Sequence, residues 1–116
     1  KLPVSAPFHC KLMSQATDIM KTEIEKTNFN DANIRLISNV TADEILNKEE
    51  LKNLLIKQIE NRVRWRESIL KMIEKGVDQF IEIGPGKVLS GLVKRINKNV
   101  KINTINSEGD IKDLKI

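Results

Sequence analysis

The chain contains one histidine, His9, which is therefore the natural candidate for acid–base chemistry near neutral pH. It lies between Pro7 and Cys10, directly before a segment with a helical pattern. Pro3 and Pro7 fix their own φ angles and favour extended conformations for the residues before them. We therefore expect the imidazole on a strand-to-helix bend that faces a cleft. A single histidine is also commonly structural, so the residue types alone leave both interpretations open.

A serine nucleophile would be the usual partner of such a base, but its motif is not in this chain. The pattern G-x-S-x-G needs two glycines four residues apart around a serine. The five glycines do not have that spacing: Gly76, Gly84, Gly86, Gly91 and Gly109. Cys10 is adjacent to His9, and sequence neighbours rarely point at each other, so we expect Cys10 to be a small buried residue. A base without a nucleophile indicates either part of an enzyme or a protein without catalytic activity.

Two other kinds of site are disfavoured. One histidine and one cysteine are too few to supply the ligands of a metal centre, so we expect no metal and no cofactor. The turn Gly84-Pro85-Gly86-Lys87 could cradle a phosphate at a helix N-terminus. It matches neither common phosphate-binding pattern, however, and Pro85 has no amide to donate. We expect this turn to let a strand and a helix pack closely.

The composition is typical of a globular protein. Of 116 residues, 40% are hydrophobic and 31% are charged, and no apolar run is long enough to cross a bilayer. The first residue is Lys1, so we expect the chain to be cut from a longer parent. A single cysteine excludes an internal disulfide and fits a reducing compartment, which predicts a cytoplasmic location.

The net charge of +4 raises the possibility of nucleic-acid binding, but the charge pattern argues against it. Lysines alternate with acidic residues along the predicted helices, as on solvated faces. Aromatic residues make up only 3% of the chain and tyrosine is absent, so there is no platform for stacking bases. The cluster of Arg62, Arg64 and Arg66 around Trp65 could contact an anionic partner, but an arginine-rich helix start is more often simply part of the surface.

Hydrophobic periodicity predicts the elements of the first half of the chain. A helix is expected over 10–26, a polar loop over 27–33 and a short strand over 34–39. Thr41 and Asp43 are expected to begin a second helix, which carries Leu51, Leu54, Leu55 and Ile59 on one stripe. A third helix follows the arginine cluster and ends at Gly76.

The second half predicts an α/β unit. A buried strand over 77–83 is followed by the turn at 84–86 and a helix over 87–97, and 101–105 can return as a parallel strand. We expect five apolar residues of that helix to face inward: Val88, Leu89, Leu92, Val93 and Ile96. The residues 106–116 are predicted to be a loosely ordered tail of the segment 1–105, and we expect no domain boundary within the chain.

Four motifs together resemble one enzyme family. In order, they are Leu2-Pro3-Val4-Ser5-Ala6-Pro7-Phe8-His9-Cys10 with Leu12-Met13, then Ile37-Ser38-Asn39-Val40, then Gln58 upstream of Val63-Arg64-Trp65, and finally Glu82-Ile83-Gly84-Pro85-Gly86-Lys87-Val88-Leu89-Ser90-Gly91-Leu92. Over 2–96 the chain resembles the C-terminal part of the malonyl-CoA:acyl carrier protein transacylases of bacterial fatty acid synthesis.

The resemblance implies a fold, a reaction and two site residues. The fold class is α/β, and residues 1–105 would form the C-terminal segment of an α/β-hydrolase-like acyltransferase large subdomain, three-layered with mostly parallel strands and helices. A serine on a G-H-S-x-G elbow takes malonyl from malonyl-CoA and passes it to the phosphopantetheine thiol of acyl carrier protein. His9 matches the catalytic histidine, which acts as general base and then as acid. Gln58 matches a glutamine whose backbone carbonyl orients that imidazole.

The chain also departs from the family pattern. It has Asn61-Arg62-Val63 where the family often has Asn-Pro-Val, which could alter the loop near Gln58. The elbow serine, the oxyanion segment and the arginine that pairs with malonyl have no counterpart here, so we expect them in a missing N-terminal portion. We therefore expect the chain alone to be inactive. The alternative is a non-catalytic module that binds acidic acyl carrier protein through its excess of Lys and Arg.

Overall fold

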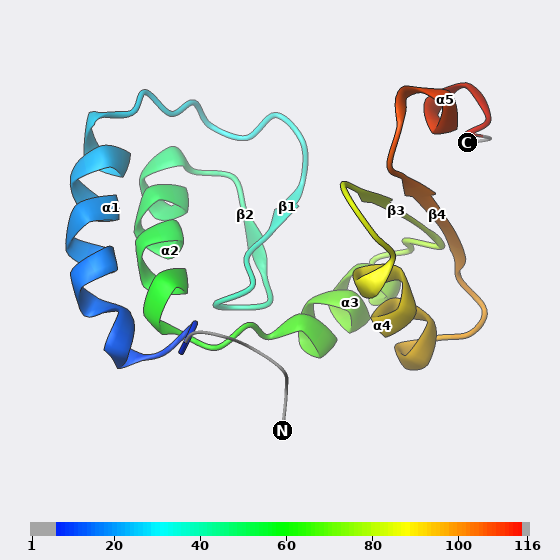
Figure 1. The fold of residues 1–116 in the computed structure, drawn as a ribbon, viewed down its shortest axis with the longest axis horizontal. Helices are drawn as coiled ribbons and strands as arrows, with labels where there is room; N and C mark the ends of the chain where they lie inside the picture. Colours follow the sequence, from blue (N-terminus) through cyan, green and yellow to red (C-terminus); the bar gives the residue numbers. More distant parts are fainter. Residues whose placement is uncertain (1–6, 115–116) are drawn as a thin grey trace. The chain divides into compact units, whose positions relative to one another are not determined.

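A computed structural model describes residues 7–114 of the chain, which divides into two compact units. The first unit is Lys1–Ser68 and the second is Ile69–Ile116, so the boundary falls inside helix α3 (Trp65–Glu74; Figure 1). Residues 1–6, which include Pro3 and the start of the first motif, lie outside the described part of the chain.

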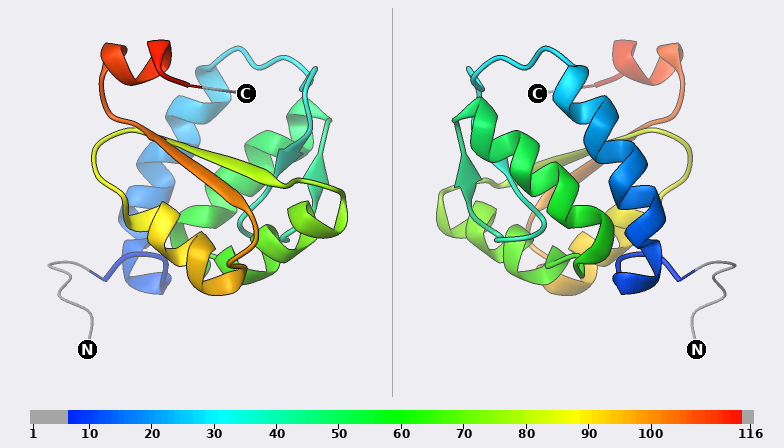
Figure 2. Two further views of the ribbon diagram at one scale, coloured as in Figure 1. Left: turned by 90° about the vertical axis from the view of Figure 1, so that its right-hand side faces the viewer. Right: turned by 90° about the vertical axis from the view of Figure 1, so that its left-hand side faces the viewer.

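Two antiparallel-running helices dominate the first unit. A single 3₁₀ turn, η1 (Lys11–Met13), leads into α1 (Ser14–Lys26), and α1 packs against α2 (Lys48–Glu60; Figure 2). The turn η1 contacts both helices. The helix predicted over 10–26 is therefore confirmed, with a tighter first turn than an α-helix has.

A short hairpin joins these helices. Strand β1 (Leu36–Ile37) pairs antiparallel with β2 (Glu44–Ile45), and Leu36 lies opposite Ile45. The strand predicted over 34–39 is thus present but only two residues long. Ser38, which follows β1, is buried and accepts the amide of Val40 on its hydroxyl, so the chain turns sharply there.

The start of the second helix was predicted at the wrong place. The Thr41 hydroxyl accepts the amide of Asp43, whose own carboxylate accepts the amide of Glu44, so both residues build the turn before β2. Helix α2 is capped instead by Asn47, whose Oδ1 accepts the amides of Glu49 and Glu50 at 2.8 and 3.2 Å. The error has a physical cause, because the side chains that cap helices also stabilise turns.

The second unit contains the predicted parallel pair of strands. Strand β3 (Gln79–Ile83) pairs with β4 (Lys101–Ile105), with Gln79 opposite Lys101 and Ile83 opposite Ile105. Helix α4 (Val88–Ile96) connects the strands and packs on both of them. This strand–helix–strand arrangement confirms the predicted α/β class.

Helix α3 is followed by a hydrogen-bonded turn at Gly76. Gly76 has a φ of 94°, its amide bonds to the carbonyl of Ile73, and the amide of Val77 bonds to that of Met72, which together form a Schellman cap. The predicted helix end at Gly76 is therefore confirmed.

Within 106–116 the chain forms a short helix, α5 (Glu108–Lys112). The division of the chain into 1–105 and 106–116 stays a prediction.

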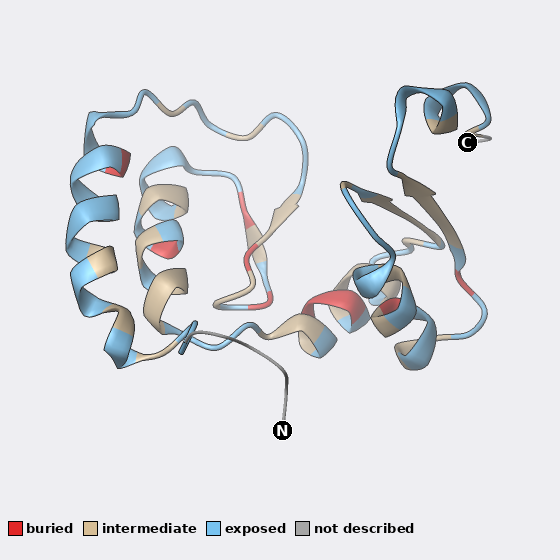
Figure 3. Cartoon of the chain, in the orientation of Figure 1, coloured by how far each residue is buried: buried red, intermediate tan, exposed pale blue. Residues whose placement is uncertain are grey.

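The buried apolar side chains of the described residues are few in each unit (Figure 3). They are Ile24, Ala42, Ile45 and Leu54 in the first unit, and Ile69, Val93 and Val100 in the second. The predicted inward face of α4 is therefore only partly right: Val93 is buried, whereas Val88 is 73% exposed and Leu89 is 43% exposed. A two-stranded sheet is too narrow to cover the whole apolar stripe of the helix.

Candidate acid–base site

The imidazole of His9 contacts the end of helix α2. Its Nδ1 lies 2.8 Å from the carbonyl oxygen of Gln58, and the two residues are 49 positions apart in the chain. Because a carbonyl oxygen can only accept, this hydrogen bond requires the proton on Nδ1. The Nε2 of the neutral ring then carries a free lone pair. His9 is exposed, so this lone pair can reach a reacting group and accept its proton.

The backbone at His9 is in an uncommon conformation. Its φ of 58° lies in the left-handed region, which costs an L-residue about 1–2 kcal/mol. Histidine is among the residues enriched there, but the conformation still has to be held by its surroundings. Here η1 follows directly and packs on α1 and α2. The bend expected at His9 is therefore a left-handed turn immediately before a 3₁₀ helix.

Cys10 lies at the start of the first helical turn, as expected, but it is less buried than predicted. It is half-buried and extended, with φ of −148° and ψ of 171°, and precedes η1. Its thiol donates to the carbonyl of Pro7 at 3.1 Å. The thiol is thus engaged by the backbone carbonyl of Pro7.

The Gln58 carbonyl is available because helix α2 ends two residues later. A helical carbonyl normally accepts the amide four residues on, and the last turn of a helix lacks these partners. The amide of Asn61 still bonds to the carbonyl of Lys57, but Asn61 itself is extended, with φ of −104° and ψ of 146°. The chain then leaves the helix axis, so the oxygen of Gln58 can accept from His9.

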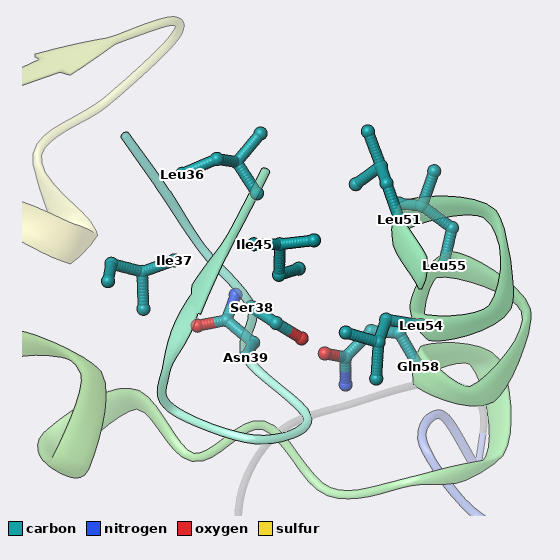
Figure 4. A pocket seen from close by; sticks show the side chains of 9 residues that line it. All are labelled: Leu36, Ile37, Ser38, Asn39, Ile45, Leu51, Leu54, Leu55 and Gln58. Carbon is teal, nitrogen blue, oxygen red and sulfur yellow. The ribbon is translucent and has the colours of Figure 1, made fainter. Parts of the chain in front are cut away.

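The side chain of Gln58 lines a cavity of about 150 Å³ in the first unit (Figure 4). Its walls are mainly aliphatic side chains from the hairpin and α2: Leu36, Ile37, Ile45, Leu51, Leu54 and Leu55. Ser38 and Asn39 are the other polar residues that line it. Gln58 therefore contributes its backbone to the contact with His9 and its side chain to the cavity.

The arginine cluster serves mainly to hold the segment after α2. Arg64 donates to the carbonyl of Thr41 at 2.9 Å, pairs with Glu67 at 3.3 Å, and its amide donates to the carbonyl of Asn39 at 2.8 Å. Arg62 pairs with the same Glu67 carboxylate at 3.4 Å. A hydrogen bond from its own backbone amide, together with the Arg64 guanidinium, lowers the pKa of Glu67. These contacts explain why Arg64 is not free to bind an anion.

The glycine turn after β3 already has partners for the amides that a phosphate would use. The carboxylate of Glu82 accepts the amides of Leu89 and Ser90, at 3.1 and 2.7 Å, in the first turn of α4. The amide of Gly86 donates to the side chain of Asn106 at 2.6 Å. The Ser90 hydroxyl, followed by the amides of Ser90 and Leu89, lowers the pKa of Glu82. The Glu82 carboxylate and the Asn106 side chain thus occupy amides that a bound phosphate would need. This fits the interpretation of the turn as a structural one.

Sequence reasoning missed Glu82 as the residue that caps α4. The only signal in the sequence was an acidic residue near the end of a strand, eight positions before Ser90. Its contact with Ser90 depends on the geometry of the turn.

Within residues 7–114, no group of three His, Cys, Asp or Glu side chains is arranged to hold a metal ion. Across the same residues, no helix has the length and apolar character needed to traverse a bilayer.

The similar sequences and the similar solved structures belong to the same class of enzyme. No protein-family model matches the chain. The malonyl CoA-acyl carrier protein transacylase of Bacillus subtilis (strain 168) is 49% identical over 100 residues, which are 86% of this chain and 32% of that protein. An acyl-carrier-protein S-malonyltransferase from Bartonella henselae is 42% identical, with a TM-score of 0.89 over 97% of this chain and 36% of that one.

A second similar structure contains a partner protein. It is a type II PKS acyl-carrier protein in complex with its malonyl-transacylase, 35% identical, with a TM-score of 0.86 over 96% of this chain and 36% of that one. Together with the parallel strands and packed helices, these likenesses define an α/β part of the acyltransferase fold. The chain belongs to the malonyl-CoA:acyl carrier protein transacylase family, and it spans about a third of the length of the relatives it matches.

Proposed function

We propose that this chain supplies the histidine half of a Ser/His acyl-transfer site in a malonyl-CoA:acyl carrier protein transacylase. The observation that carries the proposal is the 2.8 Å contact between His9 Nδ1 and the Gln58 carbonyl, with the ring exposed. This contact fixes both the tautomer and the direction of the ring, which a general base needs before it can act. The nucleophilic serine comes from a part of the protein outside this chain.

The reaction proceeds in two half-reactions, and in each of them His9 first takes a proton and then returns one. Nε2 of His9 takes the proton of the serine hydroxyl while the serine oxygen attacks the thioester carbonyl of malonyl-CoA. The C–S bond breaks, and His9 returns the proton to the departing coenzyme A thiolate. In the second half, His9 takes the proton of the phosphopantetheine thiol of acyl carrier protein. That sulfur attacks the malonyl-serine ester, and the serine oxygen leaves with the proton from His9.

The Gln58 carbonyl takes the place that a carboxylate has in a Ser-His-Asp triad. It holds Nδ1–H throughout both steps, so the ring neither rotates nor exchanges tautomers between acting as base and as acid. Because the acceptor is a backbone atom, the identity of the side chain at position 58 matters less than the path of the backbone. The reaction belongs to the cytoplasm, where malonyl-CoA and acyl carrier protein are the partners.

A chimera provides the direct test. The matched third of the Bacillus subtilis relative is replaced with this chain, and malonyl transfer to holo acyl carrier protein is measured alongside the acyl-enzyme by mass spectrometry. We expect the chimera to be active, the chain alone to show no turnover, and His9→Ala in the chimera to abolish acylation of the serine. Asn53→Ala, an exposed position on α2, is the matched control. A His9→Ala chimera with near-normal transfer would remove His9 from its role.

The second candidate is a module that binds acyl carrier protein without catalysis. Twenty basic residues against sixteen acidic ones favour an acidic partner through long-range attraction that salt screens. Binding of acyl carrier protein to the chain alone, weakened by salt and without transfer in the chimera, would favour the module. Transfer in the chimera that depends on His9 would favour the enzyme.

A further inference from the structure

The last turn of α2 is held by an unusual set of hydrogen bonds centred on Asn61. Its side-chain Nδ2 donates to the carbonyl of Lys57 at 2.7 Å, and its backbone amide donates to the same oxygen at 3.1 Å. In return, the side-chain Nε2 of Gln58 donates to the carbonyl of Asn61 at 2.9 Å. Asn61 thus directs both of its nearby donors to Lys57 and leaves the carbonyl of Gln58 to His9.

This arrangement prevents a competing hydrogen bond. If Asn61 took helical angles, α2 would continue by one residue and the amide of Arg62 would point at the carbonyl of Gln58. That carbonyl would then be engaged within the helix. The extended backbone of Asn61, with ψ of 146°, turns the chain away before this can happen.

The residue that follows Asn61 makes the side-chain contact more important. A proline at position 62 would have no amide to compete for Gln58, and its ring would by itself disfavour helical angles at position 61. This chain has Arg62 there, which has an amide and imposes no such restriction. The extended conformation at position 61 must therefore be held by hydrogen bonds. The bond from Asn61 Nδ2 to the Lys57 carbonyl is one of them, beside the bond from Gln58 Nε2 to the Asn61 carbonyl.

We infer that Asn61 is a positioning residue for His9, since its side-chain amide ends α2 at the point that frees the Gln58 carbonyl for the imidazole. The inference rests on the proposed function for its catalytic meaning. Its physical content, a link between the Asn61 side chain and the tautomer of His9, can be measured without any turnover.

The single histidine makes this measurement unambiguous, because long-range ¹H–¹⁵N spectra of the imidazole report on His9 alone. In the wild-type chain we expect the Nδ1–H tautomer to dominate the neutral ring. Asn61→Ala should lower the ratio of Nδ1–H to Nε2–H by about fivefold, as loss of one modest hydrogen bond would. Asn61→Asp has nearly the same shape but lacks the donor, so it should lower the ratio as well. Asn53→Ala should leave it unchanged.

A rescue separates positioning from general damage to the fold. In the Asn61→Ala background, Arg62→Pro removes the competing amide and favours extended angles at position 61, so we expect it to restore the wild-type tautomer ratio. If circular dichroism shows that Asn61→Ala has lost helix content, the tautomer ratio of this double variant still tests the inference. A wild-type ratio in folded Asn61→Ala, or no recovery in the double variant, would overturn the inference.

The same variants in the chimera distinguish this inference from the proposed function. We expect malonyl transfer to fall with the tautomer ratio in Asn61→Ala and to recover with Arg62→Pro. If the ratio falls while transfer stays at the wild-type rate, Asn61 positions the ring but His9 is not the base, and the proposed function fails alone.

Discussion

The left-handed backbone of His9 predicts that glycine is better tolerated there than alanine. Both His9→Gly and His9→Ala remove the ring and its bond to Gln58, so that loss cancels when the two variants are compared. Alanine keeps a backbone cost of about 1–2 kcal/mol at a φ of 58°, which glycine avoids. Glycine loses about 0.4–1 kcal/mol more conformational entropy on folding. We therefore expect His9→Gly to be more stable than His9→Ala by about 0.5–1 kcal/mol.

Urea unfolding followed by circular dichroism measures this difference. The segment is coupled to the rest of its unit because η1, two residues after His9, packs on α1 and α2. As a control, the same pair of substitutions is made at Asn53, inside α2, where alanine should be the more stable by about 1 kcal/mol. If alanine is also the more stable residue at position 9, the backbone there is not left-handed, and the account of how the ring is aimed fails.

Three further substitutions test the elements around the site. Gly91 lies inside α4, is exposed, and has open space where a Cβ would be, so Gly91→Ala should raise the free energy of unfolding by about 1 kcal/mol in urea titrations; a decrease would mean that another segment approaches this face closely. Asn47 caps α2 with two hydrogen bonds, and Asn47→Ala should lower the thermal midpoint, at a cost of about 1 kcal/mol, whereas Asn53→Ala should not. Glu82 has a lowered pKa, so its contribution to stability is complete above the ordinary glutamate pKa and disappears as the pH falls through the lowered value. The difference in unfolding free energy between the wild-type chain and Glu82→Gln should therefore be larger at neutral pH than at about pH 3; a difference that does not change with pH would contradict the assignment of this carboxylate as the cap of α4.

Several features of the fold can be predicted from residues that are close together in the sequence. The helix that begins after Cys10, the helix end at Gly76 and the strand–turn–helix around Gly84 all follow from patterns within a few residues. The local sequence was ambiguous where the same type of residue can either cap a helix or stabilise a turn. Asp43 and Asn47 have similar capping ability, and only the pairing of β1 with β2 decides that the former belongs to a turn.

The sequence by itself determined that one imidazole is available, that no serine elbow accompanies it, and that the chain has the motifs of one acyltransferase family. Local spacing carries this information, since each motif is a contiguous run of residues. Only the tertiary structure decided which atom meets His9 Nδ1 and which groups occupy the amides of α4. Those contacts join residues up to 49 positions apart, and a hydrogen bond depends on distances that are set by how the helix ends and the turns fold, not by residue type.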